Sequence, residues 1–265
     1  MRGPKQSVDR CPEGADEGKM NNGKIYIIGI GPGNPESMTG SAHKALEESK
    51  YIAGYTVYCD LIRDHFENKE YIITPMTGEE KRVALAFEKA AEGNVVSIIC
   101  SGDAGVYGMA GLACAKAAEY KNVSVKVIPG VTAALSGAAL LGAPLIHDFC
   151  VISLSDRLTP MEIIEKRLRL AAEADMPIVL YNPESKSRSG YLSHACEILL
   201  ETAEPERVCG IARNIGREGE ECEITTLEKL RNIKADMFST VFIGNSSTRD
   251  IGGFMVTARG YKSEQ

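Results

Sequence analysis

Residues 24–39 have the sequence Lys24-Ile-Tyr-Ile-Ile-Gly-Ile-Gly-Pro-Gly-Asn-Pro-Glu-Ser-Met-Thr39. The opening apolar run predicts a buried strand, and the loop after it contains Gly29, Gly31 and Gly33 with Pro32 between them. Glycine leaves the backbone uncovered and proline fixes one φ angle, so the loop is both open and stiff. Exposed backbone at a strand end is typical of a ligand-binding loop. An ordinary tight turn after a buried strand is the alternative.

Two phosphate-binding motifs do not fit this loop. A dinucleotide fingerprint needs a third glycine three residues after Gly31, where this chain has Asn34, and it needs a helix that begins at once. Pro32 and Pro35 delay the predicted helix until about residues 38–41. A P-loop is excluded as well, because no Gly-Lys-Ser/Thr follows. The loop is therefore predicted to hold a ligand in another way.

Composition limits the classes of function. The chain has 265 residues, of which 44% are hydrophobic, enough for one large or two medium domains. Its net charge of −6 does not favour electrostatic binding to nucleic acid or to an anionic membrane surface. No apolar run is long enough for a membrane span, and residues 1–22 lack the apolar centre of a signal peptide. We expect a cytoplasmic protein.

The cysteines indicate neither a metal site nor a redox pair. No C-x-x-C spacing occurs, and the four histidines are not spaced for zinc. Reduced cysteine in an apolar stretch behaves as a small core residue. We expect no bound metal and a structural role for the eight cysteines, at positions 11, 59, 100, 114, 150, 196, 209 and 222.

The periodicity of the sequence predicts two α/β domains. Residues 1–22 are polar and aperiodic, and we expect them to form a disordered lead. In residues 23–145 strands alternate with helices, which is typical of a mainly parallel sheet. The strands are expected at 24–29, 51–54, 94–100 and 123–128, and the helices at 41–49, 79–92, 108–120 and 131–141.

The pattern changes after residue 145. Shorter helices and more strand content predict a mixed sheet in residues 146–261. The strands are expected at 149–154, 177–181, 207–212 and 240–244, with a short extended segment at 221–225 that leads to residues 227–233. The helices are expected at 160–174 and 190–202. A cleft between two such domains is the default place for a ligand.

Two further glycine loops follow predicted strands of the first domain. One contains Ser101, Gly102 and Asp103, and the other runs from Pro129 to Thr132. The carboxyl ends of parallel strands meet at one edge of the sheet, where open α/β sheets bind ligands. Asp103 could accept a hydrogen bond from a ligand or cap the helix that follows. Three glycine loops at the same edge of the sheet favour a single ligand-binding site that all three form together.

Five segments of the chain form an ordered set of motifs. They are Gly29-Ile-Gly-Pro-Gly33, Ser101-Gly-Asp103, Pro129-Gly-Val-Thr-Ala133, Leu180-Tyr-Asn-Pro183 and Asn214-Ile-Gly-Arg-Glu-Gly219. Taken in this order, they resemble the tetrapyrrole (corrin/porphyrin) methyltransferase family, and the resemblance extends over about residues 24–261. Within the family, residues 102–111, 145–156 and 255–261 most resemble the branch that methylates carbon 17 of precorrin-3B or cobalt-factor III in cobalamin synthesis.

The resemblance implies two α/β domains of the tetrapyrrole methylase type and a methyl donor, S-adenosylmethionine, in the cleft between them. A sulfonium cation suits an uncrowded site formed by glycine loops. In this view Asp103 orients the donor. The positions carried over for the cofactor are Pro32, Gly33, Ser101, Gly102, Asp103, Val106, Tyr107, Thr132, Ala133, Tyr181, Ala212, Arg213 and Gly244.

The implied reaction joins methyl transfer to contraction of the macrocycle. Methyl transfer depends mainly on proximity and alignment, whereas contraction invites a general base that removes a hydroxyl proton. His147 and Asp148, at the predicted domain junction, are candidates for that base alongside Asp103. The alternative is that the His-Asp pair caps a turn or bridges the domains.

A tetrapyrrole that carries carboxylates calls for local positive charge, and guanidinium groups suit carboxylate partners. Any one of these side chains is more often a solvated surface charge, so the hypothesis concerns the group. The candidates for substrate binding are Arg157, Lys186, Arg188, Arg217 and Arg249.

Other functions stay open at this stage. They are another methylase of the same family, an rRNA ribose methyltransferase, which the acidic composition disfavours, and a non-catalytic protein that binds S-adenosylmethionine or a corrinoid. The sequence does not decide between a metal-free and a cobalt-bound macrocycle. A homodimer is an expectation from the family resemblance.

Overall fold

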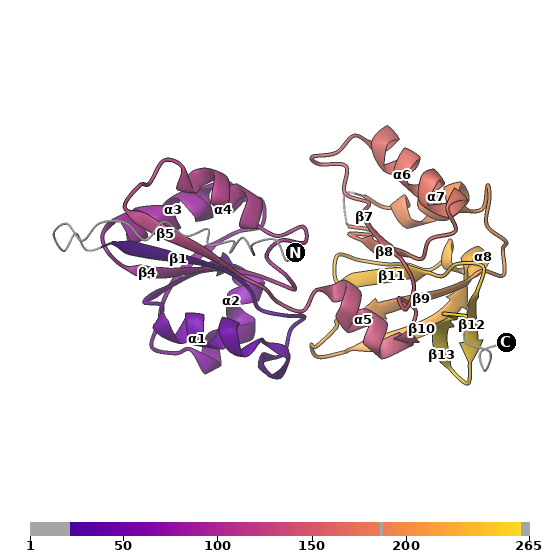
Figure 1. Cartoon of the computed structure of the whole chain (residues 1–265), viewed down its shortest axis with the longest axis horizontal. Coiled ribbons are helices and arrows are strands. Elements are labelled where there is room, and N and C mark those ends of the chain that lie inside the picture. Colours follow the sequence, from indigo (N-terminus) through magenta and orange to yellow (C-terminus); the bar gives the residue numbers. More distant parts are fainter. Residues whose placement is uncertain (1–21, 186–187, 261–265) are drawn as a thin grey trace, which may run out of the picture.

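A computed structural model describes residues 22–185 and 188–260 and contains two α/β halves side by side (Figure 1). The predicted disordered lead, residues 1–22, lies outside the described residues except for Asn22. The prediction of a parallel sheet followed by a mixed sheet is confirmed.

The first half contains a five-stranded sheet in the order β3-β2-β4-β1-β5, and all four strand pairs are parallel. The glycine loops that follow β1 and β4 start side by side, because Gly29 pairs with Cys100. The strands are β1 (Gly23–Gly29), β2 (Tyr51–Tyr55), β3 (Glu70–Thr74), β4 (Val95–Cys100) and β5 (Val123–Ile128).

Helices cover both faces of this sheet because β1 is apolar on both sides. Ile25 and Ile27 pack with Phe87 on one face, while Tyr26 and Ile28 pack on the other. This alternation follows from the two-residue period of a strand. The first face is covered by α3 (Glu79–Ala91) and α4 (Ala110–Ala117), the second by α1 (Gly40–Glu48) and α2 (Thr56–Ile62), with 3₁₀ turns at Pro35–Ser37 and Arg63–His65.

The second half contains a mixed sheet in the order β10-β9-β11-β8-β7. Only β7 and β8 pair in parallel, and the other neighbours are antiparallel. Helices α6 (Met161–Glu173), α7 (Tyr191–Leu199) and α8 (Leu227–Leu230) pack on one face. The strands are β7 (Cys150–Ser153), β8 (Ile178–Tyr181), β9 (Val208–Arg213), β10 (Glu221–Thr226) and β11 (Ser239–Ile243).

Helix α5 (Ala133–Leu141) covers the other face of this second sheet (Figure 1). Its small residues allow a close approach, since a Cβ added at Gly137 would lie 2.8 Å from the ring of Phe242. The next residues form β6 (Gly142–Ala143), which pairs with β13 (Phe254–Thr257) beside β12 (Thr248–Ile251). The sequence analysis placed 131–145 in the first domain. On this packing we propose that the boundary lies near residue 130.

Within the described part of the chain, no helix is long and apolar enough to cross a membrane.

Candidate functional site

The glycine loops after β1, β4 and β5 meet at the carboxyl edge of the parallel sheet. Gly31 and Gly102 exchange two backbone hydrogen bonds of 3.1 and 2.7 Å. A Cβ added at Gly130 would lie 2.2 Å from the carbonyl oxygen of Gly102, and one at Gly29 would lie 2.6 Å from the same atom. The loops therefore pack backbone against backbone, and only glycine fits at these contacts.

Asp103 joins two of these loops. One carboxylate oxygen accepts a hydrogen bond of 2.7 Å from the Gly105 amide, and the other accepts one of 2.9 Å from the Gly130 amide. The alternative that Asp103 caps the next helix is wrong, because the cap residue of α4 is Met109. Asp103 holds the loops in place through hydrogen bonds to its charged form, which are among the stronger kinds.

Tyr181, at the end of β8, brings the second domain to the third loop. Its hydroxyl accepts a hydrogen bond of 2.8 Å from the Ala134 amide and pairs with the Thr132 hydroxyl. The ring of Tyr107 lies 5.3 Å from that of Tyr181, centroid to centroid. Burial raises the pKa of both phenols, so both stay protonated at neutral pH.

Arg217 crosses from the second domain to the first. Its Nε donates to the carbonyl oxygen of Pro32 at 3.2 Å, and Nη2 donates to the Ser101 hydroxyl at 3.0 Å. The side chain passes directly over Gly33, where an added Cβ would lie 2.5 Å from Arg217 Cγ and 2.6 Å from the carbonyl oxygen of Gly216. Gly33 thus permits the contact between the two domains.

A pocket lies at this junction, with about 810 Å³ of empty space including the part open to solvent. Both domains contribute to its lining. The predicted residues that the structure brings together around it are Pro32, Ser101, Gly102, Asp103, Val106, Tyr107, Thr132, Ala133, Tyr181 and Arg217.

The lining fits the methyl donor expected from the sequence. Among the described residues of the pocket, Asp103 is the only acid, and both of its oxygens already accept backbone amides. The site is therefore no carboxylate cage. Val106 and Ile215 provide apolar surface, and Asn182 and Asn214 provide amide groups. Small-molecule sites commonly combine apolar walls with a few polar groups in this way.

Four residues expected at the cofactor do not line the pocket. Gly33 lies under Arg217, and Ala212 is fully buried in the core beneath α5. Arg213 turns to Glu221, 3.0 Å away. Gly244 follows the far end of β11, because β11 runs antiparallel to β8 and β9 and begins at the pocket with Ser239 and Thr240.

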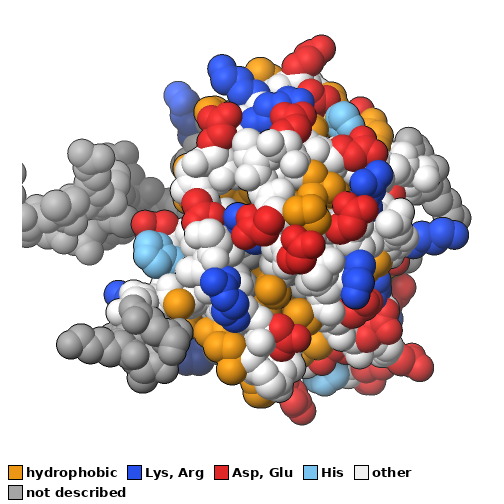
Figure 2. All heavy atoms as spheres, turned by 90° about the vertical axis from the view of Figure 1, so that its right-hand side faces the viewer, with side chains coloured by type: hydrophobic (Ala, Val, Ile, Leu, Met, Phe, Trp, Pro, Cys, Tyr) orange, Lys and Arg blue, Asp and Glu red, His pale blue; other side chains and the backbone are white. Residues whose placement is uncertain are grey.

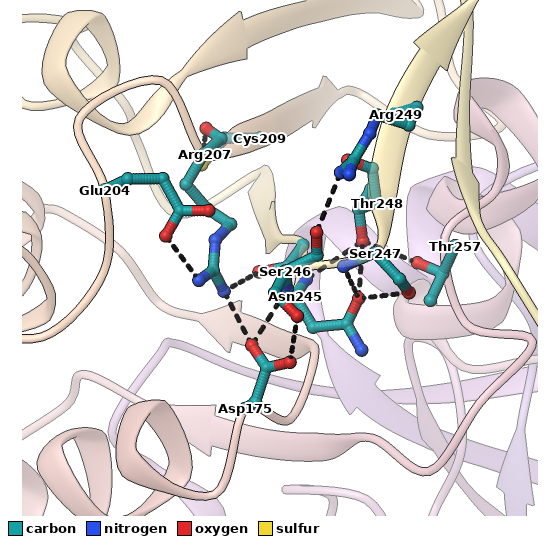
Figure 3. A network of polar contacts seen from close by, with 11 residues as sticks. Asp175, Glu204, Arg207, Cys209, Asn245, Ser246, Ser247, Thr248, Arg249 and Thr257 are labelled. Atoms are coloured by element: carbon teal, nitrogen blue, oxygen red, sulfur yellow. Dashed lines mark hydrogen bonds and ion pairs between the residues drawn. The ribbon is translucent and has the colours of Figure 1, made fainter. Parts of the chain in front are cut away.

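Gly244 belongs instead to a polar network at the opposite end of β11 (Figure 3). There Arg207 lies between the carboxylates of Asp175 and Glu204. The guanidinium of Arg249 donates to the carbonyl oxygens of Ser246 and Thr248, both at 2.8 Å. Arg249, which was expected to bind substrate, therefore lies in this network and does not line the pocket.

The remaining predicted residues do not line the pocket, or they lie outside the described residues. Arg157 is exposed and Arg188 is half-buried, and neither lines the pocket. Lys186 lies outside the described residues. The side chains of His147 and Asp148 are 53% and 93% exposed, and the Asp148 amide donates to His147 Nδ1. Neither residue lines the pocket.

Sequence reasoning did not select several lining residues. Asn182 and Asn214 have positive φ angles of 52° and 49°, and both stand in segments that carried the family resemblance. Asparagine tolerates this conformation better than most residues, so asparagine directly after a strand was a usable signal. The other residues not selected are Tyr58, Ile215, Met237, Phe238, Ser239 and Thr240.

Over residues 22–185 and 188–260, no group of three or more His, Cys, Asp and Glu side chains is arranged to hold a metal ion. The described cysteines are all free.

Two α/β domains with a backbone-lined pocket at their junction define a two-domain α/β protein with a ligand pocket between its domains. The chain belongs to the tetrapyrrole (corrin/porphyrin) methylases, whose family model matches residues 24–231. The probable cobalt-factor III C(17)-methyltransferase of Salmonella typhimurium is 44% identical over 89% of this chain and 99% of that protein. The precorrin-3B C(17)-methyltransferase of a Sinorhizobium species is 39% identical over 86% and 91%.

Solved structures agree with this assignment. The crystal structure of the methyltransferase CobJ superposes with a TM-score of 0.82 at 38% sequence identity, covering 89% of this chain and 100% of that one. The family resemblance proposed from the sequence is confirmed.

Proposed function

We propose that the protein transfers a methyl group from S-adenosylmethionine to carbon 17 of precorrin-3B or cobalt-factor III and contracts the macrocycle, as a step of cobalamin (vitamin B12) biosynthesis. The observation that carries this proposal is the junction pocket, where three glycine loops of one domain face Tyr181 and Arg217 of the other. Relatives named for this reaction match almost the whole chain.

When bound, S-adenosylmethionine supplies an activated methyl group, and the chain supplies position. Alignment of two reactants accounts for a large part of the acceleration of such a transfer. Asp103 fixes the second and third loops relative to each other, so we propose it as a positioning residue rather than as a base. Tyr181 fixes the start of α5 in the same way.

The test is an anaerobic reaction of the purified protein with S-adenosylmethionine and either metal-free precorrin-3B or cobalt-factor III, analysed by mass spectrometry. The proposal expects the gain of one methyl group with one of the two substrates, and that substrate identifies the route. Binding of both ligands without methyl transfer to either would contradict the proposal and favour a non-catalytic binding protein.

A nucleic-acid substrate has less support. The net charge is −6, and on the outer end of the second domain, acidic and basic side chains are interspersed (Figure 2). Proteins that bind nucleic acid present a continuous basic face. Addition of RNA to the assay should therefore yield no methylated product.

We also propose that the protein works in the cytoplasm as a homodimer. The free cysteines are typical of a reducing compartment, and the dimer is expected from the family resemblance. Light scattering coupled to size-exclusion chromatography would determine the oligomeric state, and cell fractionation the location.

A further inference from the structure

Arg217 has donor groups that its contacts in the protein do not use. A guanidinium carries five N–H donors. In the described part of the chain, one is directed to the carbonyl oxygen of Pro32 and one to the hydroxyl of Ser101. The guanidinium also lies over the ring of Phe238, 5.1 Å from its centroid. Since Arg217 lines the pocket, the remaining N–H groups are available to a ligand there.

The charge of Arg217 also has no counter-ion among the described residues. Other arginines of the second domain are paired: Arg207 with Asp175 and Glu204, Arg169 with Glu201, and Arg213 with Glu221. Burial lowers the pKa of Arg217, yet a guanidinium remains protonated at any physiological pH. A cation that is partly removed from water without an anionic partner is unfavourable unless a ligand supplies the anion.

A second unpaired cation strengthens the positive field on this side of the pocket. Arg82 is 3% exposed, and in the described residues it donates to Thr74 and to the carbonyl oxygen of Pro75 but pairs with no carboxylate. Burial raises the pKa of Tyr58, which lines the pocket, and the charges of Arg217 and Arg82 oppose that rise. Both charges therefore act on Tyr58. Of the two, only Arg217 lines the pocket.

We infer that Arg217 is the carboxylate receptor of the pocket and that its unused N–H groups bind a carboxylate of the ligand. This inference rests on the proposed function, because S-adenosylmethionine and a corrin precursor both carry carboxylates. A planar guanidinium suits a carboxylate through two parallel hydrogen bonds. The same group holds Pro32 and Ser101 of the first domain, so ligand binding and the contact between the domains share one side chain.

The test compares the native protein with two variants. Arg217→Met keeps an unbranched side chain over Gly33, and Arg217→Lys keeps the positive charge without the planar guanidinium group. Arg231→Met is the matched control, because Arg231 pairs with Glu228 on α8 and does not line the pocket. Circular dichroism establishes that each variant is folded. Calorimetry measures binding of S-adenosylhomocysteine and of 5′-methylthioadenosine, which lacks the carboxylate. Absorbance titration measures binding of uroporphyrin III, a stable tetrapyrrole with acetate and propionate side chains.

If Arg217 binds the carboxylate of the methyl donor, Arg217→Met weakens S-adenosylhomocysteine binding about 10- to 100-fold and leaves 5′-methylthioadenosine unchanged. If it binds the macrocycle, only uroporphyrin III binding falls by that factor. The affinity of Arg217→Lys lies between those of the native protein and Arg217→Met, and the affinity of Arg231→Met equals that of the native protein. Equal losses for the first two ligands, or no loss for any, would overturn the inference and leave Arg217 as a contact between domains. These binding data do not depend on turnover, so failure of the proposed reaction would be seen separately.

Discussion

Replacement of Gly130 by alanine tests whether the three loops are held by direct backbone packing. The added Cβ would lie 2.2 Å from the carbonyl oxygen of Gly102 and 2.5 Å from that of Gly29. Both neighbours are main-chain atoms, so no rotamer change can relieve the clash. The loops must separate, and overpacking of this kind costs about 1–3 kcal/mol.

The separation also weakens the hydrogen bond of 2.9 Å from the Gly130 amide to Asp103. A bond to a charged group contributes about 1.5–3 kcal/mol. We therefore expect Gly130→Ala to lower the free energy of unfolding by about 2.5–6 kcal/mol. We also expect loss of S-adenosylhomocysteine binding, because the loops line the pocket.

Gly111→Ala is the matched control. Gly111 lies in α4, and an added Cβ would meet nothing within 4 Å. The free energy of unfolding of this variant should therefore rise by about 0.5–1 kcal/mol. Urea unfolding followed by circular dichroism measures both changes, and calorimetry measures binding. A Gly130→Ala protein with the native unfolding midpoint and native affinity would refute the account of the loops.

Three further predictions concern other parts of the fold. Tyr181→Phe leaves the buried Ala134 amide without its acceptor, so it should cost about 1–3 kcal/mol in urea unfolding and slow methyl transfer; native values in both assays would contradict this. Burial acts to raise the pKa of Asp175, but hydrogen bonds from Ser246 and the charge of Arg207 outweigh it and lower that pKa. The resulting stability is present above the unfolded-state pKa of about 3.9 and is lost as pH falls through the lower folded value. Asp175→Asn should therefore flatten the loss of stability as the pH falls below about 4. Burial raises the pKa of Cys59 and Cys100 to about 11 and that of Cys196 to about 12, so among the described cysteines the exposed Cys114 and Cys222 should react first with a thiol reagent in native protein, as peptide mapping would show; early labelling of Cys100 would argue against the packing of β4.

Regular elements with a strong period were predictable from the sequence. The strand expected at 123–128 is β5, and the helix expected at 79–92 is α3, one residue shorter. Helix α2 and strand β3 were not predicted, and neither were β6, β12 and β13. These elements are short, and tertiary packing or strand pairing stabilises them more than local periodicity does.

Some residues of the candidate site were likewise predictable from the sequence, and others were not. Loops after parallel strands were predictable, because the carboxyl ends of such strands always meet at one edge. In the second domain this rule does not apply, since the strands run in both directions. Gly244 was expected at the pocket because it follows a strand, but β11 is antiparallel to β8 and β9 and presents Ser239 and Thr240 there instead.

The sequence by itself determined the class of fold, the three glycine loops and the family, because each is written in local residue patterns such as 29–33 and 101–103. Only the tertiary structure decided that α5 belongs to the second sheet, that Arg217 alone of the described candidate arginines lines the pocket, and that His147 and Asp148 do not. The physical reason is that strand order and direction bring distant residues together, and neither is encoded in the period of any one segment.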